Sequence, residues 1–110
     1  GMKLIIAIVN RDDTKAVTQN LSANGYSSTR LASAGGFLLA NNATLLIGVE
    51  EEKVQGAIDI IRQFSHSRKE LIPVSANSEL GTAFVNAAPV EIVVGGATVF
   101  VVDVERFEHL

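Results

Sequence analysis

Three apolar runs constrain the fold of this chain more than any other feature of its sequence. Residues 3–9 (KLIIAIV), 43–49 (ATLLIGV) and 97–102 (ATVFVV) are almost continuously apolar. Such runs are typical of strands covered on both faces, because alternate side chains of a strand point to opposite sides of its sheet. Charged residues make up only 19% of the chain, below the usual share of about 25%. We therefore expect part of the surface to be buried against another copy of the chain.

A first helix is predicted over residues 12–23, directly after the first apolar run. Asp12 or Asp13 is expected to cap its N-terminus, where carboxylates are favoured. Val17 and Leu21 lie one turn apart and form a narrow apolar stripe that can face a sheet. The sequence therefore predicts a helix that packs one narrow side on the strands.

The segment after this helix begins with Asn24-Gly25, a pair typical of helix ends because both residues tolerate left-handed geometry. Residues 26–34 then predict a second strand. Neither face of that strand is strongly apolar, so we expect it to lie partly against solvent or a ligand. The third strand is predicted over residues 43–49.

A second helix is predicted over residues 50–65. Its three opening glutamates favour a helix N-terminus. Apolar residues then recur at three- and four-residue steps, at Val54, Ala57, Ile58, Ile61 and Phe64. Residues 70–75 predict a short edge strand, because Pro73 cannot donate a backbone hydrogen bond.

The end of the chain predicts a hairpin. Gly95-Gly96 separates two β-branched runs, residues 90–94 and 97–104, and such a pair favours a tight turn. The predicted order is β-α-β-β-α-β with the last strand elaborated into this hairpin, in one domain over residues 1–110. This is the ferredoxin-like, or split βαβ, α+β arrangement, in which two helices cover one face of an antiparallel sheet.

Residues 29–49 contain the most unusual local pattern. Gly35-Gly36 permits backbone geometry that side chains forbid and lets a ligand approach the chain closely. Phe37 and Leu38 follow at a loop edge, and Asn42 offers both donors and acceptors for a base or an amide. The same residues also fit a plain β-hairpin whose glycines relieve a turn and whose Phe37 packs on its own core. The local pattern leaves both interpretations open.

The chemistry-bearing residues predict a binding protein rather than an enzyme. The sequence contains no GxSxG, GxGxxG or GxxxxGK[ST] motif, and His66 and His109 lack metal-ligand spacing. It has no cysteine for a disulfide or a thiolate site. We therefore predict no catalytic residue, no metal site and no cofactor.

Charge and hydropathy suggest where the protein works. The net charge is −3 and no basic run is present, which argues against nucleic-acid polymers and anionic membranes as partners. No apolar run reaches the length of a transmembrane helix and no signal peptide is recognisable, so we expect a cytoplasmic protein. Gly1 before Met2 has the form of a remnant from a cleaved tag.

Four strings taken together resemble one known family. They are MKLIIAIV (2–9), TRLASAGGFL (29–38), LIGVE (46–50) and PVEIVVGGATVFVVDVERF (89–107). They are similar to the PII-like cyclic-di-AMP receptor family, of the PstA type, which is related to the nitrogen-regulatory PII proteins. The resemblance implies a ferredoxin-like homotrimer that binds cyclic di-AMP between subunits. It also implies signalling to a target protein, which the sequence does not identify, through the loops after the second strand and second helix.

The resemblance implies a set of ligand-binding residues by position. Glycines would bring backbone N–H groups near phosphate or base, and Asn42 would pair with an adenine edge. Phe37 or Phe100 would stack on a base, and Thr29 would donate to a phosphate oxygen. The implied set is Thr29, Gly35, Gly36, Phe37, Leu38, Asn42, Gly48 and Phe100.

Four positions depart from the family pattern, and at one of them Arg30 replaces a lysine and keeps the charge. Gly25 and Ser27 stand where the family usually has Asn and Arg, and His109 stands where it has Gln. Loss of the arginine removes a charge-assisted phosphate contact, typically worth about 1.5–3 kcal/mol. Two alternatives to cyclic di-AMP binding therefore stay open: another adenine nucleotide on the same trimer, or a protein-interaction module that needs no ligand.

Overall fold

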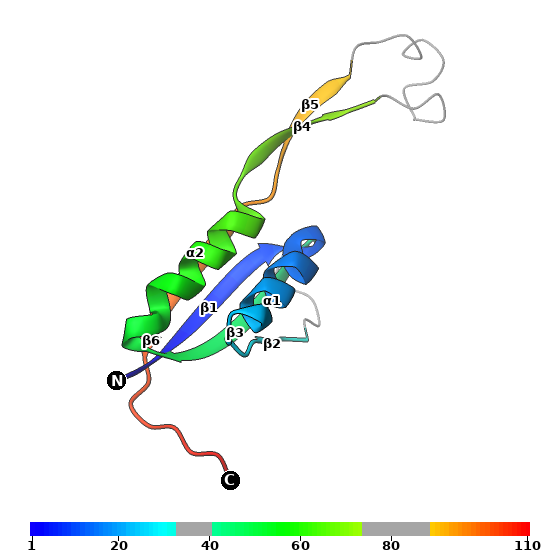
Figure 1. Ribbon diagram of the computed structural model, residues 1–110. Helices are drawn as coiled ribbons and strands as arrows, with labels where there is room; N and C mark the ends of the chain where they lie inside the picture. The colour runs from blue at the N-terminus through cyan, green and yellow to red at the C-terminus, as the bar shows by residue number, and fades with distance from the viewer. Residues whose placement is uncertain (33–40, 74–88) are drawn as a thin grey trace.

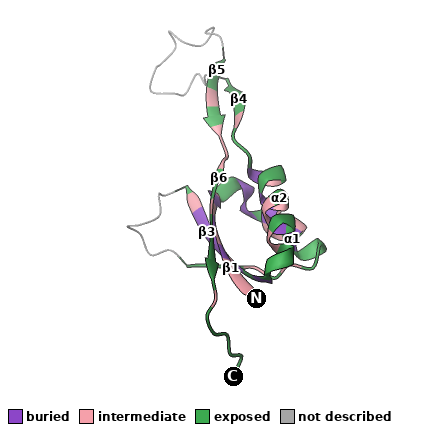
Figure 2. Cartoon of the chain, turned by 90° about the vertical axis from the view of Figure 1, so that its left-hand side faces the viewer, coloured by how far each residue is buried: buried purple, intermediate pink, exposed green. Residues whose placement is uncertain are grey.

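The computed structural model describes residues 1–32, 41–73 and 89–110. Its body is a four-stranded sheet with two helices on one side (Figures 1 and 2). The strands lie in the order β2-β3-β1-β6, and every neighbouring pair is antiparallel. They are β1 (Met2–Asn10), β2 (Thr29–Arg30), β3 (Asn42–Glu50) and β6 (Ala97–Asp103). The predicted ferredoxin-like α+β arrangement is confirmed.

The core lies between the sheet and the helices. Alternate residues of β1 point toward the helices, and Ile5, Ala7 and Val9 are fully buried there. The register places Ile5 opposite Ile47 and Ala7 opposite Leu45, so the buried residues of β3 continue the same layer. Burying a large aliphatic side chain contributes about 1.5–3 kcal/mol, which makes this layer the main source of stability.

The first helix begins differently from the prediction. A short 3-10 turn, η1 (Arg11–Asp13), precedes α1 (Thr14–Ala23). The capping residue is Asn10, whose Oδ1 accepts a 2.9 Å hydrogen bond from the Asp12 backbone N–H. Asp13 makes no capping bond, because its carboxylate is engaged by a residue distant in sequence. The predicted stripe is confirmed, since Val17 and Leu21 are both fully buried.

The connection from α1 to β2 confirms the helix stop and corrects the strand. Gly25 has φ +85°, and its N–H donates to the carbonyl of Ser22. The predicted strand over residues 26–34 is wrong at its start, because regular pairing covers Thr29–Arg30 alone within the described residues. Tyr26 instead packs against the core, and its hydroxyl donates a 2.9 Å hydrogen bond to the carbonyl of Lys53.

The second helix follows the predicted pattern. A 3-10 turn, η2 (Glu51–Lys53), leads into α2 (Val54–Ser65). Ala57 and Ile61 are buried on its inner face. Ser65 is buried as well, and its hydroxyl donates to the carbonyl of Ile61. Gly56 faces the hydroxyl end of Tyr26, where a Cβ would collide with the phenol oxygen, so this glycine allows the ring to approach the helix.

A separate two-stranded ribbon extends beyond the end of α2 (Figure 1). It consists of β4 (Arg68–Ile72) and β5 (Val90–Val94), paired antiparallel, and we call it the β4–β5 arm. The predicted hairpin across Gly95-Gly96 is therefore wrong: β5 pairs with β4, whereas β6 pairs with β1. Gly95 and Gly96 have φ +76° and +94°, so they form a joint between two sheets instead of a turn within one.

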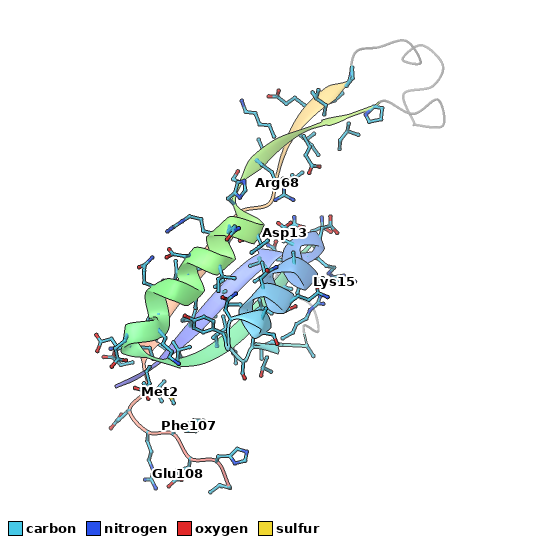
Figure 3. All side chains as sticks on the ribbon, viewed as in Figure 1. Met2, Asp13, Lys15, Arg68, Phe107 and Glu108 are labelled. Carbon is cyan, nitrogen blue, oxygen red and sulfur yellow. The ribbon has the colours of Figure 1, made fainter. Side chains whose placement is uncertain are left out.

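An ion pair holds the base of the arm against the body. Arg68 Nη2 lies 2.9 Å from Asp13 Oδ1, and Figure 3 shows the two side chains meeting at the end of α2. The side chain of Asp13 is 8% exposed and that of Arg68 is 35% exposed. The hydrogen bond to Asp13 raises the pKa of the Arg68 guanidinium above its usual value. A Cβ at Gly95 would lie 2.5 Å from Arg68 Nη1 and 2.8 Å from the carbonyl oxygen of His66, so the joint requires glycine.

The side of the sheet opposite the helices is apolar. At several positions no described residue covers it. We call it the open face; it comprises Leu4, Ile6, Ile8, Leu46, Phe100 and Val102. Phe100 is 52% exposed and Val102 is 42% exposed. An apolar sheet face of this kind normally packs against another layer. From the sequence we expected another copy of the chain to pack on the second side of the sheet. The open face fits that expectation, which stays a prediction.

Candidate functional site

The structure describes half of the eight residues that the resemblance implied as ligand contacts. Thr29, Asn42, Gly48 and Phe100 lie in described strands. Gly35, Gly36, Phe37 and Leu38 lie outside the described residues. The geometry of the candidate site therefore has to be built from the four strand residues and their neighbours.

All four described candidates share the open face. Thr29 pairs with Leu46, Leu46 pairs with Ile6, and Ile6 pairs with Phe100. These pairs form one row of side chains across the full width of the sheet. Asn42 and Gly48 lie an even number of residues from Leu46 along β3, so they point to the same side. The sheet brings residues from three strands to one surface.

Thr29 and Gly48 line one cavity of about 840 Å³. We call it the tail cavity, because the residues after β6 form part of its wall. Figure 3 shows Phe107 of that tail below the start of β1, where Met2 is labelled. The lining residues are Met2, Leu4, Ser27, Thr29, Leu46, Gly48, Val104, Phe107 and His109. They come from four segments of the chain, and most of them are apolar.

The tail cavity combines apolar walls with a few polar groups. Ser27 and Thr29 contribute hydroxyls and His109 contributes an imidazole. A Cβ at Gly48 would meet nothing within 4 Å, so Gly48 leaves open space at the cavity wall. A concave, mostly apolar site with convergent polar groups is typical of small-ligand sites.

Two of these lining residues are the positions that depart from the family pattern. Ser27 and His109 are more than 80 residues apart in sequence (109 − 27 = 82), yet both line the tail cavity. Sequence reasoning noted each departure separately and did not place them together. It missed Met2, Leu46 and Phe107 as lining residues, because apolar strand and tail residues carry no local signal for a ligand site.

Asn42 lies away from the tail cavity. It lines a separate hollow of about 360 Å³, together with Gly95 and Gly96 of the joint. Asn42 and Gly48 are six residues apart on β3, which corresponds to about 20 Å along a strand. Within one chain, the structure therefore brings Thr29 and Gly48 together and leaves Asn42 at the opposite end of β3.

Phe100 is separated from Thr29 by the width of the sheet. The two residues occupy the ends of one row, with β3 and β1 between their strands. Three strand spacings amount to about 14 Å. Phe100 lies on β6, an outer strand of the sheet, and is exposed. Within one chain, the sheet therefore does not bring the Phe100 ring next to Thr29.

Thr44 is a polar group on the open face that sequence reasoning missed. It pairs with Ile8 and shares its side of the sheet. Its hydroxyl oxygen is buried and has no hydrogen-bond partner in the part of the chain that the structure describes. Leaving such a group unsatisfied costs about 1–3 kcal/mol. The signal was a single hydroxyl residue inside the apolar run 43–49, which was predicted to be apolar throughout.

The electrostatics of the site are simple. Of the residues that the structure describes, no Asp, Glu, Lys or Arg lines the tail cavity, and His109 is the one that brings an imidazole to its wall. Among the described residues, no three His, Asp or Glu side chains gather as metal ligands would. Within that same part of the chain, no helix is both long and apolar enough to cross a bilayer.

Comparison with known proteins bears on the fold and the family of this chain. A solved structure described as a functionally unknown protein from Pediococcus pentosaceus is 36% identical in sequence and has a TM-score of 0.78, with 99% of this chain and 97% of that chain covered. The sequence pattern of the cyclic-di-AMP receptor family matches residues 2–110. The family resemblance drawn from the four strings is thereby confirmed. This chain belongs to the cyclic-di-AMP receptor family.

Proposed function

We propose that this chain is a single-domain signalling protein that forms a homotrimer and binds cyclic di-AMP between its subunits. The observation that carries the proposal is the row across the open face. Thr29 and Phe100 share that row, yet they lie at opposite edges of one sheet. A second copy packed edge to edge would bring its Phe100 next to Thr29 of the first, and a ligand held between the two copies would then meet both residues.

The apolar open face supports the same assembly. Leu4, Ile6 and Leu46 lie on it, and Phe100 and Val102 are about half exposed. A neighbouring sheet would bury this area and stabilise the assembly at about 25 cal/mol for each Å² removed from water. A cyclic trimer closes such an interface without leaving unpaired apolar edges.

In this proposal, the polar groups of the open face read the ligand. Asn42 pairs with an adenine edge, and Thr29 donates its hydroxyl to a phosphate oxygen. Gly48 leaves space for close approach, since no atom lies within 4 Å of its would-be Cβ. Phe100 of a neighbouring copy walls in a base. The remaining proposed contacts, Gly35 to Leu38, lie outside the described residues.

Signalling would pass through the loops that follow β2 and β4. Residues 33–40 join β2 to β3, and residues 74–88 join β4 to β5. Asn42 shares its hollow with Gly95 and Gly96 at the base of the β4–β5 arm. A ligand held by Asn42 would therefore lie close to the joint that sets the direction of the arm, which would be the surface offered to a target protein.

Calorimetry with cyclic di-AMP, cyclic di-GMP and AMP tests the proposal, together with light scattering of the free protein. We expect heat of binding for cyclic di-AMP and a mass of three chains. Asn42→Ala should weaken binding by about 1–3 kcal/mol, the cost of losing a buried polar partner. Asn20→Ala is the matched control: it removes an amide from α1 on the helix side, where it bonds the carbonyl of Ala16, and should leave affinity unchanged.

Other outcomes would identify the alternatives. Heat from AMP and none from cyclic di-AMP would mean that the trimer binds a different adenine nucleotide. No heat from any nucleotide would leave the ligand-independent interaction module. A stable monomer would contradict the intersubunit site.

A further inference from the structure

The described residues that line the tail cavity include no permanently charged side chain, although the proposed ligand carries two phosphodiester charges. Its nine lining residues include neither lysine nor arginine. A buried phosphate without a cationic partner loses the stronger, charge-assisted kind of hydrogen bond. Ser27 and Thr29 can donate hydroxyls but cannot neutralise charge. His109 is the lining residue that can do so, because histidine changes charge between pH 5 and 8.

We propose, resting on the function proposed above, that His109 meets a ligand phosphate as an imidazolium, so that cyclic di-AMP binding takes up a proton. The structure places His109 and Ser27 on the walls of one cavity, with Gly48 leaving open space in it. The cation that is absent at position 27 is thus supplied from the C-terminal tail. This receptor would bind its ligand more tightly as the pH falls.

Several charged groups near the tail cavity pair with one another. Lys53 and Glu50 line an adjoining hollow, which shares Ser27 and Gly48 with the tail cavity. On the tail, Arg106 Nη2 lies 2.7 Å from Glu108 Oε1, so these two charges pair with each other. On β1 and β6, Lys3 bonds Asp103, and both belong to the helix side of the sheet by alternation.

The charged residues of β2, β3 and the tail also place no charge on the described wall of the tail cavity beside His109. On β3, Glu50 lies 3.8 Å from the amine of Gly1, and on β2, Arg30 alternates away from Thr29. Glu105 is exposed on the tail. Neither Arg30 nor Glu105 lines the tail cavity. A phosphate placed between Ser27 and His109 would therefore act on the imidazole with no lining carboxylate to compete.

Calorimetric titration with cyclic di-AMP from pH 6 to pH 8.5 tests the proposal, repeated in buffers of different ionisation enthalpy to count protons. The ligand's phosphodiester charge is constant over this range. Wild type should bind roughly tenfold more tightly at pH 6 than at pH 8.5, the value of one charge-assisted contact, and take up a proton near neutral pH. His109→Gln, which keeps a donor without charge, should remove the pH dependence. His109→Lys should bind at pH 8.5 as tightly as wild type does at pH 6.

The second histidine provides the matched control. His66 follows α2 and does not line the tail cavity, so His66→Gln should keep the full pH dependence. A pH dependence that survives in His109→Gln, or is absent from wild type that binds well, would overturn this inference and leave the proposed function intact. No binding by wild type or by Ser27→Arg at any pH would instead overturn the proposed function, and this inference with it.

Discussion

The strands of the body and of the β4–β5 arm both carry large aliphatic side chains, yet these side chains are buried to very different degrees. Ile5 of β1 and Leu45 of β3 are fully buried under the helices, whereas Leu71 of β4 and Val93 of β5 are each 67% exposed. Figure 2 shows the contrast, with purple confined to the body and helices and green dominating the arm. Similar aliphatic residues therefore form a core in the body and stay exposed in the arm.

The contrast indicates that contacts at the base of the arm, where it joins the body, fix its position. An isolated two-stranded ribbon is only marginally stable in water, and among the described strands β4 and β5 pair with no strand but each other. Their fixed points are the Asp13–Arg68 ion pair and the Gly95-Gly96 joint. The body has a continuous buried core, while the described contacts that position the arm are few.

The largest expected effect comes from the same substitution made in each region. Leu45→Ala empties a fully buried site and should lower the free energy of unfolding by about 2–5 kcal/mol. Leu71→Ala removes an exposed side chain and should change it by less than about 0.5 kcal/mol. Denaturant unfolding at one fixed protein concentration measures both, because assembly couples to stability. An equally large loss for Leu71→Ala would mean that another chain covers the arm.

The next effect concerns the base of the arm. Arg68→Met leaves the buried Asp13 carboxylate without its ion-pair partner and should destabilise the protein by about 1–3 kcal/mol. Adding Asp13→Asn should recover part of that loss, since the uncompensated charge is then gone. Arg62→Met is the matched control: its pair with Asp59 is well exposed and contributes little. Chemical denaturation of the four proteins gives these differences.

The same variant should also loosen the arm relative to the body. The chain has no native cysteine, so spin labels can be attached at Lys15→Cys and Lys69→Cys alone. Arg68→Met should broaden the distance distribution between the two labels, and Arg62→Met should not. An unchanged distribution would show that the Gly95-Gly96 joint positions the arm without the ion pair.

The smallest expected effect is on the pH dependence of stability, compared between one surface ion pair of the body and one of the arm. The hydrogen bond from Lys3 lowers the pKa of Asp103 below its usual value. The pair therefore stabilises the body above the ordinary aspartate pKa, and that contribution is lost as the pH falls below about 4. Unfolding measured from pH 5 to pH 2 should lose less stability in Asp103→Asn than in wild type. Glu91→Gln, which breaks the Lys69–Glu91 pair of the arm at 3.5 Å, should match wild type.

Local periodicity was enough to predict the body. The alternation in β1 and β3, the stripe of Val17 and Leu21, and the stop at Gly25 all depend on neighbours within about one turn or one strand. The open face also followed from the sequence, because strands with apolar residues on both sides need two covers. The four family strings then identified the receptor family, which the match over residues 2–110 confirms.

Pairing across the chain was decided only by the tertiary structure. Gly95-Gly96 carries the local signal of a hairpin, yet β6 pairs with β1 and β5 pairs with β4. The hydrogen bonds of two long-range strand pairings stabilise the chain more than one tight turn would. A local pattern therefore cannot decide which strands pair. Asp13 looked like a helix cap until the fold brought Arg68 to it from 55 residues away. The tail cavity likewise joins Ser27, Thr29, Gly48 and His109 from separate segments, and no local pattern encodes their proximity.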